Sequence, residues 1–116
     1  MPTELFRFEG SIDKHAAEKA VIWLVDHAEE LARRKAMMVY HDDRLRVVKS
    51  TAMALSDEKS IAAKEAEAYR SGVYKTAVDE RRNAVFNYER LMNSKMACIA
   101  TKELFQTFEA SLRHIV

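Results

Sequence analysis

The sequence has very few residues that break helices. Only two glycines and one proline occur in 116 residues, and the proline is Pro2. Glycine and proline supply most tight turns, so their scarcity argues against a many-stranded β fold. Alanine, glutamate, lysine, arginine, leucine and methionine, which favour helices, are plentiful. The composition therefore predicts one all-α domain over residues 1–116, with few connections.

Long apolar runs, cysteine pairs and an excess of one charge are also missing. The longest strictly apolar run, residues 20–25, is far shorter than the ~18 residues that cross a bilayer. No signal-peptide pattern opens the chain, so we expect a cytoplasmic protein. The single Cys98 excludes an internal disulfide and reads as a small buried residue. The sequence has 19 basic and 18 acidic residues, so a positively charged binding site could only come from a local cluster of basic residues.

The longest uninterrupted helical pattern covers residues 73–116, which contain no glycine and no proline. Apolar side chains return there every three or four residues, which predicts one long helix. The predicted inward stripe is Val73, Tyr74, Ala77, Val78, Arg81, Ala84, Val85, Tyr88, Met92, Met96, Ile99, Leu104, Phe105, Phe108, Leu112 and Ile115.

A second long helix is predicted over residues 12–55, with Ser11 or Asp13 as its N-cap. A strict heptad fits it poorly, because heptad steps lead onto Lys35 and Asp42, and parts fit an eleven-residue spacing better. We therefore expect a bend or an exchange of partners within residues 33–43.

A short helix is predicted between the long ones, over residues 57–70. Ser56 is its expected N-cap, and Gly72 is the expected left-handed residue after its end. Residues 1–10 are expected to form a short arm with the apolar side chains Leu5, Phe6 and Phe8. This arm either folds back over a helix end or inserts into a second subunit.

The predicted architecture is two long helices joined by a short one, in an antiparallel, coiled-coil-like hairpin. A single hairpin would leave much of its methionine, phenylalanine and tyrosine surface exposed to water. We therefore expect a homo-oligomer, in which two copies form a helical bundle.

Motifs that carry chemistry are missing from the sequence. No Glu-x-x-His pair for a di-iron site and no His-Glu-x-x-His zinc motif occurs, and one cysteine cannot build a multi-thiolate site. Arg33 and Arg34 follow Glu29-Glu30 where a magnesium-dependent pyrophosphohydrolase needs acids. We expect no enzyme activity, no metal and no cofactor.

Two groups of basic residues are candidate nucleic-acid contacts, and the rings of Tyr40 and Tyr88 could stack on nucleic-acid bases. The other reading is an ordinary charged helix surface, because acidic residues are interleaved. The candidate contacts are Arg33, Arg34, Lys35, Arg44, Arg46, Lys49, Arg81, Arg82 and Arg90.

Several segments resemble small helical proteins encoded by tailed phages and prophages. They are the run of residues 40–55, Ala-Lys-Glu-Ala-Glu-Ala-Tyr at 63–69 with Tyr74 shortly after, the 79–92 stretch, and Phe-Glu-Ala-Ser at 108–111. The resemblance covers residues 40–113 and, more loosely, 28–36. Members of this group are often encoded beside single-strand annealing recombinases, exonucleases or single-strand-binding proteins.

This resemblance implies an accessory role in DNA recombination or replication, in the cytoplasm of the host cell. Such a protein would bind single-stranded DNA or a recombination protein. The alternative is a phage inhibitor that blocks a host defence or replication protein through its helical surface. The group carries no known catalytic residues, so the resemblance assigns none here.

Overall fold

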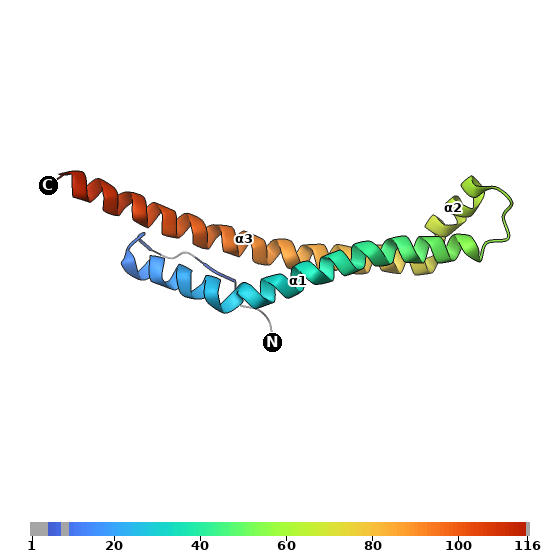
Figure 1. Cartoon of the computed structure of the whole chain (residues 1–116), viewed down its shortest axis with the longest axis horizontal. Coiled ribbons are helices and arrows are strands. Elements are labelled where there is room, and N and C mark those ends of the chain that lie inside the picture. Colours follow the sequence, from blue (N-terminus) through green and yellow to red (C-terminus); the bar gives the residue numbers. More distant parts are fainter. Residues whose placement is uncertain (1–4, 8–9, 116) are drawn as a thin grey trace. The chain divides into compact units, whose positions relative to one another are not determined.

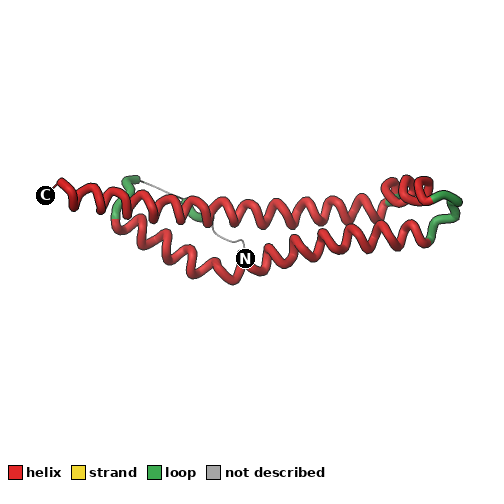
Figure 2. Tube along the Cα trace, turned by 45° about the horizontal axis from the view of Figure 1, so that its top comes forward, coloured by secondary structure: helices red, strands yellow, loops and turns green. Residues whose placement is uncertain are grey.

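The computed structural model describes residues 5–7 and 10–115, apart from the side chains of His114 and Ile115. The helices are α1 (Lys14–Ala54), α2 (Ile61–Arg70) and α3 (Gly72–Ile115). The long helices α1 and α3 pack antiparallel, and the short α2 joins them (Figure 1; Figure 2). The predicted all-α fold of two long helices connected by a short one is confirmed.

The contacts divide the chain into two units. Unit 1 consists of residues 1–32 and 89–116, and unit 2 consists of residues 33–88. Each unit therefore contains one half of α1 packed on one half of α3, and unit 2 also contains α2. The boundary in α1 falls where the stretch 33–43, singled out from the sequence, begins.

Side chains cap the first turns of α1 and α2. The Asp13 carboxylate accepts a hydrogen bond from the Ala16 backbone N–H at 2.8 Å, so Asp13 is the N-cap of α1. At α2, the Ser60 hydroxyl accepts from the Ala63 N–H at 3.1 Å. The predicted cap Ser56 is wrong, because its hydroxyl donates to Glu67 and accepts from the Glu58 N–H in the preceding loop.

Ser71 alone separates α2 from α3. Its hydroxyl donates to the Ala68 carbonyl at 2.7 Å and accepts from the Tyr74 N–H at 3.2 Å, so one side chain serves the end of α2 and the start of α3. Gly72 is the first residue of α3 and has no positive φ, so the predicted left-handed turn there is wrong. A serine that satisfies both helix ends makes a left-handed glycine unnecessary.

The inward face of α1 follows a seven-residue repeat, contrary to our sequence interpretation. The repeat was hidden because His27, Arg34 and His41 occupy inward positions, where a sequence reading expects apolar residues. The buried or half-buried series are Ala17, Leu24, Leu31, Met38, Leu45 and Ala52, and, three residues later in each repeat, Ala20, His27, Arg34, His41 and Val48.

The inward face of α3 is lined by smaller residues than we predicted. Leu91 and Cys98 are fully buried, and the polar Ser94 and Thr101 are buried beside them. The predicted stripe followed the large apolar side chains and therefore drifted off this face. It is wrong at the exposed positions Val73, Arg81, Met96, Leu104, Phe108 and Leu112.

Candidate functional site

The candidate cations at the α1–α3 contact of unit 2 are paired with acids. The Arg81 guanidinium donates to the Asp42 carboxylate, and Arg44 Nε lies 3.7 Å from Glu80 Oε2. Each of these pairs joins α1 to α3. Their positive charges are therefore largely compensated where a phosphate backbone would have to approach.

Two more candidate cations are also paired. Lys49 Nζ lies 2.6 Å from Glu65 Oε1, and the Tyr69 hydroxyl donates to the same carboxylate oxygen at 3.1 Å. The hydrogen bond with Glu65 raises the pKa of Lys49, and that with Lys49 lowers the pKa of Glu65. This cluster attaches α2 to α1. Arg82 Nη1 lies 3.5 Å from Asp79 Oδ1, which belongs to the same helix, α3.

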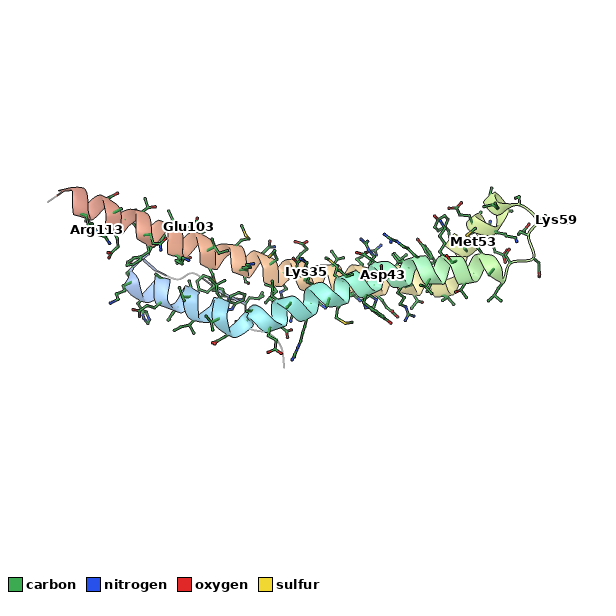
Figure 3. The ribbon with its side chains drawn as sticks, in the orientation of Figure 1. Lys35, Asp43, Met53, Lys59, Glu103 and Arg113 are labelled. Atoms are coloured by element: carbon green, nitrogen blue, oxygen red, sulfur yellow. The ribbon has the colours of Figure 1, made fainter. Side chains whose placement is uncertain are left out.

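The remaining cations are spread over both units. Arg34 is half-buried, and its guanidinium donates to the Asn87 carbonyl oxygen at 3.0 Å. Arg33, Lys35 and Arg46 are exposed on α1 in unit 2, in the part of the helix that Lys35 and Asp43 mark in Figure 3. Arg90 belongs to unit 1, apart from the other eight. The structure thus places the candidate cations without gathering them into one uncompensated stripe.

The two candidate stacking residues differ in accessibility. Tyr40 is 53% exposed and packs edge-on against His41, with ring centroids 5.1 Å apart. Tyr88 is only 8% exposed. A ring this buried belongs to the core of unit 2, so it offers no face to a nucleic-acid base.

A polar hollow of about 370 Å³ lies between α1 and α3 in unit 2. The Nδ1 atom of His41 is buried there without a hydrogen-bond partner in the described structure. The hollow carries both charge signs, which gives it no preference for an anion or a cation. Its lining residues are Arg34, Met37, His41, Glu80, Asn83, Ala84 and Asn87.

Unit 1 carries an apolar groove of about 440 Å³. Val21 and Ile22 on its wall are 42% and 59% exposed, and Val25, about one turn further along α1, is 72% exposed. This surface was not predicted, because the sequence alone does not show which residues of the apolar run 20–25 face outward. The groove is lined by Lys14, Ala17, Glu18, Val21 and Ile22 of α1 and by Phe105 of α3.

In unit 1, α3 carries a second apolar surface, which we call the α3 ridge. Its large side chains Met96, Leu104, Phe108 and Leu112 are between 45% and 62% exposed. Residues four apart are neighbours on a helix surface, so these side chains form a row that winds around α3. The α3 ridge is Met96, Ala100, Leu104, Phe108 and Leu112, and all five are exposed.

The core of unit 1 surrounds the only tryptophan. Trp23 is 8% exposed, and its ring stacks on His27 with centroids 4.2 Å apart. His27 Nδ1 lies 2.8 Å from the Trp23 carbonyl oxygen, which holds the imidazole in this position. Burial raises the pKa of the Cys98 thiol to about 11, as expected for a structural cysteine.

Comparison of the chain with known proteins finds no match. It matches no family model, no curated protein and no solved structure. Within the described residues, no group of three or more histidine, cysteine or acidic side chains could hold a metal ion. No helix in that part of the chain is long and apolar enough to cross a membrane.

Proposed function

We propose that this chain is a non-enzymatic accessory protein that acts by binding protein, and that it self-associates through the apolar surfaces of unit 1. The observation that carries this proposal is the pairing of an exposed groove and an exposed ridge on one small unit. Apolar side chains predominate on both surfaces, and the five ridge residues are all exposed. Exposed apolar surface of this kind is typical of protein interfaces.

The charges favour protein binding over direct contact with single-stranded DNA. Arg44, Lys49, Arg81 and Arg82 all have acidic partners. A phosphate would have to displace these carboxylates, and each displacement removes part of the electrostatic gain that drives DNA binding. DNA contact would therefore rest mainly on Lys35 and Arg46, which are exposed on α1.

The setting that we propose is phage DNA recombination or replication, on the strength of the resemblance alone. In that setting the chain holds a recombination protein or a second copy of itself. The inhibitor reading uses the same apolar surfaces against a host protein. In both proposals the chain acts by binding a protein through its apolar surfaces, so protein binding is the property to test first.

The test is the molar mass of the full chain in solution, measured by light scattering and sedimentation over a range of concentrations. We expect the wild type to exceed the monomer mass at tens of micromolar. Phe108→Glu in the ridge and Ile22→Glu in the groove should each weaken association by about tenfold or more, because a carboxylate would be buried without a partner.

The matched control is Gln106→Glu, which adds the same charge two residues from Phe108. Residues two apart point about 200° away from each other around a helix. Gln106 is exposed, so this variant should associate like the wild type. A monomeric wild type at the highest concentration would reject self-association.

A labelled single-stranded oligonucleotide, titrated at two salt concentrations, tests the DNA mode on the same samples. Salt-sensitive micromolar binding that Lys35→Ala and Arg46→Ala reduce would reject the protein-only mode.

A further inference from the structure

The N-terminal arm is seated on the core of unit 1. Leu5 and Phe6 are half-buried and pack against the cluster of Ala20, Trp23, Leu91 and Cys98. The Phe6 ring meets the Trp23 ring edge-on, with centroids 6.4 Å apart at 64°. In Figure 1 and Figure 2 the described part of the arm lies beside α1 and α3 of this unit. We call the cluster of Ala20, Trp23, Leu91 and Cys98 the arm seat.

The arm seat is shaped by small side chains. Ala20 and Cys98 are both fully buried, and their size leaves room for larger groups above them. Trp23 supplies a broad aromatic edge from α1. Small residues beside one large ring make a surface that fits the leucine and phenylalanine of the arm.

The arm is attached to its seat through side chains and a turn. The hydrogen bonds described in this stretch are local to the turn, such as that from the Asp13 N–H to the Ser11 carbonyl at 3.1 Å. Gly10 has a φ of +83°, a left-handed conformation that glycine adopts without strain and that reverses the chain direction here. A contact made by two side chains is weak enough to open and close.

We propose that the arm seat is an acceptor site for the N-terminal arm of a second copy, so that self-association exchanges arms between chains. This inference rests on the self-association that we propose above. The contacts of Leu5 and Phe6 are the same in either arrangement, so exchange sacrifices none of them. Ten extended residues span about 33 Å, which is enough to reach a neighbouring chain once the turn at Gly10 opens.

The single tryptophan makes the exchange measurable with full-length chains. The acceptor is the chain with Leu5→Ser and Phe6→Ser, whose seat is empty and whose Trp23 emission should move to longer wavelength. The donor is the Trp23→Ala chain, which is silent in tryptophan fluorescence and retains the arm while its own seat lacks the ring. Mixing the two should restore the wild-type emission of Trp23 and give a two-chain mass.

The matched control is a donor that also carries Leu5→Ser and Phe6→Ser, which should restore nothing. Because Trp23→Ala removes a buried ring, circular dichroism must show that the donor is helical. If it is not, the Trp23→Phe chain, whose aromatic ring retains part of the seat, replaces it at higher concentration.

A synthetic peptide of residues 1–12, added to the acceptor, provides a second measurement. Restoration by the donor chain with a two-chain mass supports the exchange. If the peptide restores the Trp23 emission and the donor chain does not, exchange between copies is overturned. If neither restores the emission, the acceptor site is overturned. If neither restores emission while the wild type still associates and Phe108→Glu does not, the exchange fails and the proposed function stands.

Discussion

Three inward polar side chains of this molecule lie within hydrogen-bond distance of backbone carbonyl oxygens. The Thr101 hydroxyl donates to the Ala97 carbonyl at 2.8 Å, one turn back along α3. His27 meets the Trp23 carbonyl in the same way on α1, and Arg34 reaches the Asn87 carbonyl of the opposite helix. A buried polar atom without a partner costs about 1–3 kcal/mol, so these contacts let polar residues occupy positions that a helical hairpin usually gives to apolar ones.

The Cys98 thiol should react slowly in the folded protein. It is fully buried, and a pKa of about 11 leaves about a hundredfold less thiolate at neutral pH than the ordinary value of 9.0. We expect a thiol reagent such as Ellman's reagent to modify the native chain at least a hundredfold more slowly than the chain in denaturant. The measurement is absorbance against time, with Cys98→Ala as the blank.

The arm variant extends this measurement. Leu5→Ser with Phe6→Ser uncovers the seat that contains Cys98, so its native rate should rise above that of the wild type. Equal native and denatured rates for the wild type would contradict the burial of the thiol.

At the scale of the helices, their existence was predictable and their rotation was not. Continuous helix formers without glycine or proline fixed the two long helices to within a few residues. The rotation of α3 depends on Ser94, Cys98 and Thr101, which are small and partly polar and carry little hydrophobic signal. The larger Met96 and Phe108 carry a strong signal and face outward, so the sequence pattern pointed to the wrong side.

The candidate site was unpredictable for a related reason. Arg81 and Asp42 are 39 residues apart in sequence, and only the register of α1 against α3 brings them together. The sequence showed the cations but not the acids that face them. The interleaved acidic residues supported the alternative of an ordinary charged helix surface. Four of the nine cations fit that alternative, because each forms an ion pair with an acidic residue.

The N-cap of α2 offers a prediction at this scale. Ser60→Ala removes the hydroxyl that accepts from the Ala63 N–H, and loss of an N-cap costs about 1 kcal/mol. Ala68 is the one residue of α2 that is fully packed, so this cost should appear as local opening of α2. Amide hydrogen exchange should show α2 exchanging about fivefold faster.

Lys59→Ala is the control for the cap, because it changes an exposed neighbour and leaves the Ser60 hydroxyl in place. Unchanged exchange in the Ser60→Ala helix would mean that the cap contributes nothing to its stability.

At the scale of the whole molecule, the described chain exposes more large apolar side chains than it buries. Sixteen are exposed, whereas Trp23, Tyr88 and Leu91 are the only residues larger than cysteine among its buried hydrophobic ones. A chain of this size already buries a modest fraction of its surface on folding. Its stability should therefore depend on what covers the exposed side chains.

If copies cover each other, thermal stability should rise with protein concentration, because association favours the folded state by mass action. For a dimer that unfolds as it dissociates, tenfold more protein adds about 1.4 kcal/mol per mole of dimer, which corresponds to roughly 3 °C when two chains of this size unfold together. Circular dichroism at 222 nm over a hundredfold range of concentration measures this shift. Phe108→Glu, which weakens association, should melt at a lower temperature than the wild type at every concentration, whereas Gln106→Glu should follow the wild type. A wild-type midpoint that does not move would mean that each chain is stable alone, with its apolar surfaces left for a different protein.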